Sequence, residues 1–217
     1  VPIGGLAADL LIGAGCVKSI EAAAVSLGEM GQAPRFTLAA EEGSIEIIDS
    51  TCPAIHTALQ ASEKGVPFIP LRGLIGSDLV KFRRDWKVVD DPFDEEKRKI
   101  VLIPALQPDF AIFHSPLGDC FGNIWIGKRR ELMTLSHAAK TTLVTVEKIT
   151  KKSLLADEKT VAGTLSNLYI SAIAVVPGGA RPLSLPGSYD CDRSEIYKYS
   201  QLARTNKGFK DFVSKLY

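Results

Sequence analysis

The stretch DFAIFHSPLGDCFGNIW, residues 109–125, is where the sequence is most informative about the fold. It opens with an apolar run, and a histidine and a serine follow at the end of this run. Such a run is typical of a strand buried on both faces of a parallel sheet. Gly118, Asp119 and Gly122 follow within a few residues. Glycine permits positive φ, and an aspartate side chain accepts hydrogen bonds from turn amides. We therefore predict a buried strand that ends in a tight turn.

The polar residues of this stretch are also those that metal sites and nucleophiles use. A structural metal site would require a second cluster to match His114, Asp119 and Cys120, and the sequence contains none. A serine nucleophile on a strand-to-helix turn requires Gly-x-Ser-x-Gly, which is absent. We therefore expect no metal, and we interpret Asp119 and Asn123 as braces of a turn at a strand end, where α/β proteins bind ligands.

Further apolar segments flank this stretch and alternate with helical patterns. Residues 52–64 carry alanine, isoleucine and leucine at helical spacing, and Gly65 follows as a residue that commonly ends helices. The strand candidates are residues 66–71, 99–106, 109–115, 141–149 and 168–176. The segment TTLVTVEKI among them reads as one uninterrupted strand. This alternation predicts a single α/β domain of 217 residues with an open, mostly parallel sheet and helices on both faces.

Several other segments are expected on the surface. Residues 81–99 are charged and irregular, which indicates a solvated excursion between two strands. Arg129 and Arg130 are interpreted as a solvated or interface face. The patterns at 194–202 and 210–216 predict two surface helices near the C-terminus.

Charge and composition exclude several classes of protein. The formal net charge is +1, so no basic surplus points to nucleic acid or an anionic membrane. No apolar run approaches the roughly 18 residues that a membrane-spanning helix requires. The four cysteines are far apart, which indicates reduced thiols and favours the cytoplasm. The first residues, VPIGG, lack a signal-peptide pattern and read as a strand end in mid-fold, so we expect a preceding segment in the natural protein.

Cys52 and His56 form a second candidate site. They lie four residues apart on the predicted helix, so both can occupy one face of it. Cys52 would start that helix, where the helix dipole lowers a thiol pKa and favours a thiolate–imidazole pair. The alternative is an inert thiol beside a histidine near the helix start, because buried cysteines of this kind are common.

The glycine loop RGLIGSDL, residues 72–79, offers a third candidate. Its glycines, Gly73 and Gly76, allow backbone amides to approach a substrate closely, and Ser77 adds a hydroxyl. Arg72 is well suited to a bidentate contact with a substrate carboxylate. A plain turn with a surface arginine explains the same residues, and both interpretations stay open.

The order and spacing of these segments resemble the A subunits of family I CoA-transferases, of the glutaconate CoA-transferase type. The family pattern is an apolar strand, a histidine, a spacer, an aspartate, two residues and Gly-Asn, matched here by His114, Asp119, Gly122 and Asn123. A Gly-Gly-Ala-x-Pro turn followed by Gly-x-Tyr matches residues 178–189. The resemblance runs from about residue 2 to the C-terminus.

The resemblance implies a subunit of a heteromeric enzyme with a CoA-transferase-like fold. Its substrates would be an acyl-CoA thioester and a carboxylate, and no cofactor would be bound permanently. A B subunit would be the partner and would supply the nucleophilic glutamate, because this chain has no Ser-Glu-Asn-Gly motif. The family's N-terminal strand and Gly-Gly-Phe loop are also absent here, so the chain should be inactive alone. Ser26, Gly28 and Phe36 match the stretch that lines the subunit interface near the acyl group.

Two alternatives stay open. Enzymes similar to these transferases hydrolyse or decarboxylate acyl-CoAs, and similar hydrolases have a glutamate at about the position of Cys52. A cysteine there speaks against that hydrolysis, although the thiol could serve a related reaction. The other alternative is a non-catalytic binding or regulatory module on a related sugar-phosphate-binding fold, which would be a monomer with a polar, ligand-sized pocket.

Overall fold

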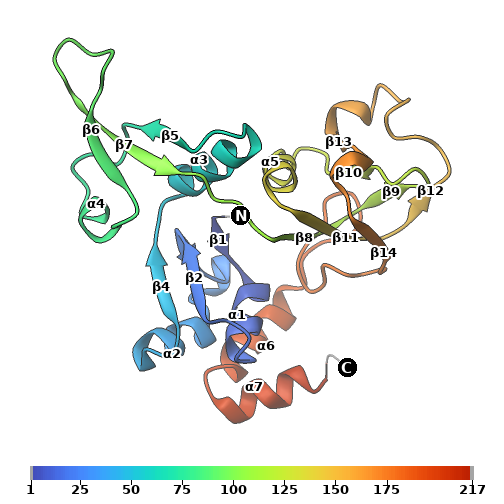
Figure 1. Cartoon of the computed structure of the whole chain (residues 1–217). Coiled ribbons are helices and arrows are strands. Elements are labelled where there is room, and N and C mark those ends of the chain that lie inside the picture. Colours follow the sequence, from blue (N-terminus) through green and yellow to red (C-terminus); the bar gives the residue numbers. More distant parts are fainter. Residues whose placement is uncertain (1, 216–217) are drawn as a thin grey trace. The chain divides into compact units, whose positions relative to one another are not determined.

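The computed structural model describes residues 2–215 of the chain, which divide into two compact units (Figure 1). The first unit contains the residues up to Cys52 and those from Cys191 onward, and the second unit contains Pro53–Asp190. The predicted α/β class is confirmed, since short strands, many of them in parallel pairs, alternate with helices. The interpretation as one domain stays a prediction. No helix within residues 2–215 combines the length and apolar character needed to cross a membrane.

The first unit joins short strand pairs to helices from both ends of the chain. Its elements are β1 (Ile3–Gly4), α1 (Leu6–Gly13), β2 (Ser19–Ala22), β3 (Ala24–Val25), η1 (Gly28–Met30), α2 (Pro34–Glu42), β4 (Glu46–Asp49), α6 (Arg193–Leu202) and α7 (Asn206–Val213). The pairs β1 with β3 and β2 with β4 are both parallel. Gly43 ends α2 in the left-handed conformation at φ 64°, which a residue with a Cβ adopts only at a cost.

Helices α1, α6 and α7 share one apolar core. Its buried residues are Leu6, Ile196, Tyr199, Ala203, Phe209 and Phe212. The two C-terminal helices are present as expected, each with an exposed face, and the opposite face of each packs into this core. Their partner α1 lies almost 190 residues away in sequence, so a local pattern could not reveal it. Of the expected 210–216 helix, residue 216 lies outside the described residues.

Asp9 on α1 is fully buried and joins three helices of the first unit. Its Oδ1 accepts a hydrogen bond from the Phe36 amide at 2.7 Å, and its Oδ2 accepts from the Arg35 amide at 3.3 Å and the Tyr199 hydroxyl at 2.6 Å. Residue 33, at the N-cap of α2, is alanine and offers no capping side chain, so Asp9 satisfies the first amides of α2 instead. Burial and the Asp9 carboxylate raise the pKa of Tyr199 far above its usual range, which keeps the hydroxyl a donor.

Removing the Tyr199 hydroxyl tests this buried contact. We expect Tyr199→Phe to lower the free energy of unfolding by about 1–2 kcal/mol, because a hydrogen bond to a carboxylate is lost inside the core. Denaturation in urea measures the change. Tyr197→Phe is the matched control, since Tyr197 lies on the exposed side of the same helix, and its effect should stay within about 0.5 kcal/mol. Equal losses for the two variants would contradict the contact.

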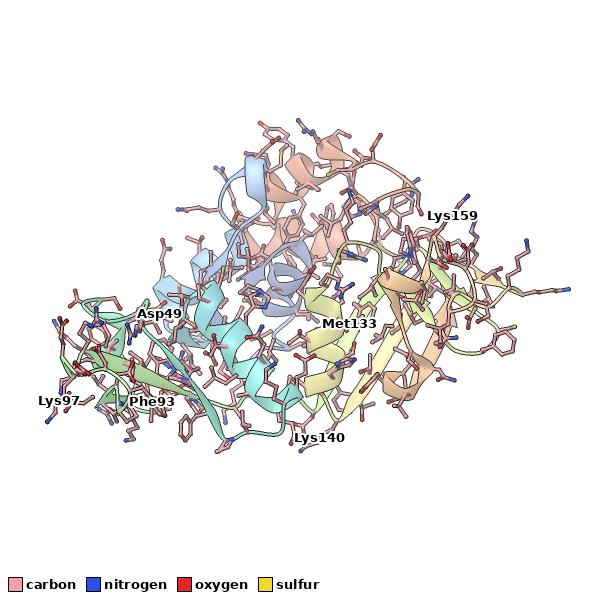
Figure 2. All side chains as sticks on the ribbon, turned by 90° about the horizontal axis from the view of Figure 1, so that it is seen from above. Asp49, Phe93, Lys97, Met133, Lys140 and Lys159 are labelled. Carbon is pink, nitrogen blue, oxygen red and sulfur yellow. The ribbon has the colours of Figure 1, made fainter. Side chains whose placement is uncertain are left out.

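Helix α3 (Cys52–Glu63), which belongs to the second unit from Pro53 onward, lies against one face of an antiparallel sheet. The sheet has the order β5 (Phe68–Leu71), β7 (Lys99–Pro104), β6 (Lys87–Asp90), and a short helix, α4 (Leu79–Phe82), lies in the connection. The buried residues between α3, the sheet and the connection are Ala54, Ala58, Leu74, Trp86, Val101 and Ile103. The expected solvated excursion at 81–99 was therefore wrong in part, because it contains α4 and β6. Phe93 and Lys97, in the connection between β6 and β7, lie at the outer end of this region (Figure 2).

A parallel sheet forms the other half of the second unit, with the order β14 (Ala172–Val175), β11 (Thr141–Val146), β8 (Phe110–Ser115). Helix α5 (Glu131–Ala138) lies beside β8 and packs on α3 through an apolar cluster (Figure 1). Because all three strands run in one direction, their carboxyl ends share an edge of the sheet. In register, Val146 lies opposite both Ser115 and Val175.

A small mixed sheet adjoins that edge. Its order is β12 (Ile149–Thr150), β9 (Leu117–Asp119), β10 (Ile124–Trp125), β13 (Thr164–Leu165), and the short helices η2 (Val161–Gly163) and η3 (Asn167–Tyr169) flank β13. The expectation of one uninterrupted strand over 141–149 was wrong. β11 ends at Val146, two residues leave the ladder, and β12 then pairs in a different sheet. The first residue of the break is Glu147, whose side chain has another role.

Candidate functional site

The carboxyl ends of β8 and β11 bring three polar side chains together. Thr145 lies opposite His114 in the parallel register, and Glu147 follows the end of β11. Nδ1 of His114 lies 2.8 Å from Oγ1 of Thr145, and Nε2 lies 2.7 Å from Oε1 of Glu147. A carboxylate only accepts hydrogen bonds, so Nε2 donates in the second contact. The strand pairing therefore creates a histidine–carboxylate pair whose side chains are only 10% and 16% exposed.

Glu147 is the centre of this network. Besides the bond from His114, its carboxylate accepts from the Gly178 amide, at 2.9 Å to Oε2 and 3.1 Å to Oε1, and from the Tyr189 hydroxyl at 2.8 Å. Burial acts to raise the pKa of this carboxyl group, but the hydrogen bonds from Gly178, His114 and Tyr189 outweigh it and hold the pKa below its ordinary value. Glu147 is therefore a charged anchor for the loop that follows β14.

That loop closes around His114. The Tyr189 hydroxyl accepts a hydrogen bond from the Ala180 amide at 3.0 Å while it donates to Glu147. Gly179 passes so near the imidazole that a Cβ at this position would lie 2.8 Å from the His114 ring. The Gly-Gly-Ala-x-Pro turn and the Gly-x-Tyr motif, separate in sequence from the strand with the histidine, thus meet at one carboxylate.

The turn predicted after the histidine strand is present, and Asp119 braces it. Asp119 is 2% exposed. Its Oδ1 accepts from the amides of Phe121 and Asn123, both at 2.9 Å, and its Oδ2 accepts from Nδ2 of Asn123 at 2.8 Å and the Leu154 amide at 2.9 Å. Gly122 has φ 90°, the positive value that the glycine predicted. The bracing roles of Asp119 and Asn123 are confirmed, whereas contact of either residue with a substrate stays a prediction.

These bonds limit what the cluster can do chemically. The Glu147 carboxylate accepts from three neighbours within the second unit, and both ring nitrogens of His114 have partners there. A carboxylate that is only 16% exposed and held by three donors is suited to holding the loop, because those bonds stabilise its charge and fix its position. Among residues 2–215, no group of three or more His, Cys, Asp or Glu side chains is arranged to hold a metal ion.

Arg72 lies at the start of the glycine loop after β5, as predicted, but its guanidinium has partners within the chain. It forms an ion pair with Asp91 and lies 3.6 Å from Asp94. The Arg72 hydrogen bond is the main reason that the pKa of Asp91 is lowered. The proposed contact with a substrate carboxylate would have to displace or share these partners, and it stays a prediction.

The remainder of the glycine loop forms a compact turn. Gly76 has φ 88°, and the Ser77 amide donates to the Leu74 carbonyl at 3.1 Å. The Ser77 hydroxyl is buried and has no hydrogen-bond partner within the described part of the chain. Gly73 has open space where a Cβ would be. These features fit the plain turn and leave a substrate role for Gly73, Gly76 and Ser77 as a prediction.

In the first unit, the stretch from Ser26 to Phe36 is a braced loop that leads into α2. Ser26 Oγ accepts from the Gly28 amide at 2.9 Å, and Ser26 also forms a β-bridge with Gln32. Gly28 has φ 64°, and the Phe36 amide is held by Asp9. A hollow of about 390 Å³ borders this loop and includes Gln32 in its wall. The loop is therefore braced by hydrogen bonds within the chain, and its contact with an acyl group stays a prediction.

Cys52 is the first residue of α3, as predicted, and His56 lies one turn further along the same helix. Both side chains are partly exposed, and the Cys52 thiol is free. Within residues 2–215 no hydrogen bond joins the two side chains. A thiolate–imidazole pair is therefore not formed here, and a catalytic role for either residue stays a prediction.

Sequence reasoning missed three residues of the network. Glu147 was counted as part of a strand, and Thr145 faces His114 only because of the parallel register. Arg129 was expected on a solvated or interface face, but its Nη2 donates to the His114 carbonyl at 2.9 Å. A charged residue directly after an apolar strand, one strand away from a histidine at a strand end, was the signal that could have identified Glu147.

Several known proteins are similar to the chain in sequence, although no protein-family model matches it. An uncharacterized protein of Archaeoglobus fulgidus is 33% identical over 95% of this chain, which spans only 46% of that protein. The A subunit of the 3-oxoadipate CoA-transferase of Pseudomonas knackmussii is 30% identical over 95% of this chain and 73% of its own length. The cholesterol ring-cleaving hydrolase IpdA subunit of Mycobacterium tuberculosis is 29% identical over 98% of this chain and 76% of its own.

A solved structure gives the same result. Glutaconate coenzyme A-transferase of Acidaminococcus fermentans superposes with a TM-score of 0.88 and 26% sequence identity, covering 98% of this chain and 72% of that one. The match therefore includes the histidine strand, the braced turn and the loop that ends at Tyr189. With this fold, these motifs and these relatives, the chain belongs to the A subunits of the family I CoA-transferases.

Proposed function

We propose that the chain works as the A subunit of a heteromeric acyl-CoA:carboxylate CoA-transferase whose B subunit supplies the attacking glutamate. The observation that carries the proposal is the occupied state of Glu147, the carboxylate at which the family's motifs converge. Its oxygens accept from Gly178, Tyr189 and His114, so it is committed to the fold. A nucleophile on the B subunit is also supported by the absence of a Ser-Glu-Asn-Gly motif in this chain.

The chemistry follows from a carboxylate nucleophile. The glutamate of the partner attacks the thioester carbonyl, the C–S bond breaks, and an acyl–glutamyl anhydride and a CoA thiolate result. The thiolate then attacks the glutamyl carbonyl of the anhydride, which releases the first carboxylate and leaves a glutamyl-CoA thioester. The acceptor carboxylate passes through the same steps in reverse order. Backbone amides are needed for the oxyanions, and the loops at Gly28 and Gly76 are our candidates to provide them.

The proposal is tested by reconstitution. We expect the 217-residue chain alone to show no exchange of labelled carboxylate into acyl-CoA, and we expect the chain with its B subunit to catalyse this exchange. Borohydride or hydroxylamine added to the working complex should trap a glutamate of the B subunit. Exchange by this chain alone at the rate of the complex would overturn the proposal.

A hydrolase or decarboxylase is the competing function, because one relative is named as a hydrolase subunit. Cys52→Ser separates the two, since the transferase reaction makes no use of that thiol. Unchanged exchange in the variant complex supports transfer. Loss of turnover in Cys52→Ser, combined with no trappable glutamate on the partner, would favour hydrolysis or decarboxylation.

A cytoplasmic location is part of the same proposal. All four cysteines, Cys16, Cys52, Cys120 and Cys191, are free thiols. Free thiols are typical of proteins that work in a reducing compartment.

A further inference from the structure

The sheet of β5, β7 and β6 is apolar on both of its faces. Val101 and Ile103 of β7 belong to the core that α3 covers. Ile100 and Leu102 alternate with them along the strand and therefore point to the opposite, outward face. Phe68 on this outward face is 45% exposed, and a hollow of about 550 Å³ lies beside it. An antiparallel sheet with one face toward water is expected to place polar residues there, so an open apolar face is typical of a surface that binds a partner.

Phe93 lies at the edge of this hollow, in the connection between β6 and β7, and is 97% exposed. Its amide donates to Oδ1 of Asp91 at 3.0 Å. The Asp91 amide donates to the Arg98 carbonyl, and the Lys97 amide donates to the Asp94 carbonyl, both at 2.9 Å. The connection lies at the outer end of this half of the unit (Figure 2) and presents Phe93 on a fixed backbone. A side chain held in this way loses little conformational entropy when it binds.

Two charges of opposite sign follow Phe93 in the same connection, on Glu95 and Lys97. Both side chains are exposed, and neither has a hydrogen-bond or ion-pair partner among residues 2–215. Their neighbour Arg98, in contrast, is paired with Asp94 at 2.5 Å. One unpaired negative and one unpaired positive charge beside an exposed ring form a surface that is complementary in charge to a copy of itself.

We propose that this outward face binds a second copy of the chain about a two-fold axis, with Phe93 of each copy in the hollow of the other. Glu95 of each copy then pairs with Lys97 of the other, as a two-fold contact requires. A strongly acidic or basic partner would leave one of these two charges unpaired. A small apolar molecule would fill the hollow but leave Phe93 in water. The inference does not rest on the proposed function, because it concerns this chain alone.

Sedimentation equilibrium of the 217-residue chain over a wide range of concentration tests the association. We expect a monomer–dimer equilibrium in which Phe93→Asp raises the dissociation constant of the dimer about thirtyfold, as the loss of a buried aromatic anchor predicts. Phe82→Asp is the matched control, since Phe82 on α4 is 78% exposed and lines no part of the hollow. A monomer at every concentration, or equal dissociation constants for wild type and Phe93→Asp, would overturn the proposal.

Charge reversal tests the two-fold arrangement. Glu95→Lys and Lys97→Glu each bring like charges together twice, so each should weaken the dimer about tenfold. The two changes combined in one chain restore opposite charges, and the double variant should dimerise as tightly as wild type. Glu158→Lys is the matched control, because it changes the net charge equally at an exposed glutamate between β12 and β13. A double variant weaker than both single variants would overturn the proposal.

Binding of the B subunit distinguishes the two protein occupants of this face. We expect Phe93→Asp to bind the B subunit with the affinity of wild type, because the face is covered by a second copy of this chain. Loss of B-subunit binding in this variant would assign the face to the B subunit and overturn the proposal. Dimerisation of the chain is measured without turnover, so a dimer that shows no transfer in the complex would count against the proposed function alone.

Discussion

Asp119→Ala is expected to lower the free energy of unfolding by about 3–4 kcal/mol, because it leaves several buried donors without an acceptor. The wild-type carboxylate accepts from the amides of Phe121, Asn123 and Leu154 and from the Asn123 side chain, at distances of 2.8 to 2.9 Å. Water reaches the site poorly, since Asp119 is 2% exposed. Urea denaturation followed by circular dichroism measures the loss.

Two further variants make this result specific. Asp119→Asn keeps one acceptor oxygen and should cost about half as much, since its amide nitrogen then faces donors. Asp109→Ala is the matched surface control, because Asp109 forms an exposed ion pair with Lys140 that should be worth less than about 1 kcal/mol. If Asp119→Ala were as mild as Asp109→Ala, the turn would not depend on the carboxylate.

Glu147→Gln is expected to lower the free energy of unfolding by about 2–3 kcal/mol, the second-largest effect. The substitution keeps the shape of the side chain but removes its charge. One amide oxygen still accepts from Gly178, while the amide nitrogen is brought against the donors of His114 or Tyr189. Glu158→Gln, on an exposed glutamate of the same unit, is the control and should be nearly neutral.

The same carboxylate makes stability depend on pH in acid. The hydrogen bonds hold the pKa of Glu147 in the folded chain below its ordinary value of 4.5, so the folded state favours the charged form. Its contribution is fully present above about pH 5 and is lost as the pH falls through the lowered pKa. We expect the free energy of unfolding of Glu147→Gln, measured by urea denaturation, to fall less steeply than that of wild type between about pH 6 and 3. If the free energy of unfolding of the variant fell as steeply in acid as that of wild type, other carboxylates would be responsible for the pH dependence.

The turn after the histidine strand could be predicted because its chemistry is local. Asp119 bonds groups two and four residues ahead, and Gly122 needs its positive φ for the same short bend. Turn residues at fixed offsets encode such structures directly. The family's motifs could be recognised for the same reason, since each is contained in about a dozen residues.

The network around Glu147 could not be predicted because its members are far apart in sequence. Glu147 bonds to His114, 33 residues before it, and to Tyr189, 42 residues after it. Only the parallel register of β8 and β11 and the path of the loop after β14 bring them together. Arg72 shows the same limit, because its partners Asp91 and Asp94 arrive through a strand that looked like irregular surface chain.

The first unit is assembled from both ends of the chain, and this order has a consequence for synthesis on the ribosome. The second unit is continuous, so its residues are all available before residues 191–217 have been translated. The core around α1 is incomplete until Tyr199, Phe209 and Phe212 have been translated. Asp9 is buried only once Tyr199 packs against it. Until then the apolar face of α1 lacks its partners. A nascent chain therefore carries residues 2–52 in an unfinished state while the whole second unit is translated, and a chaperone has that time to bind them.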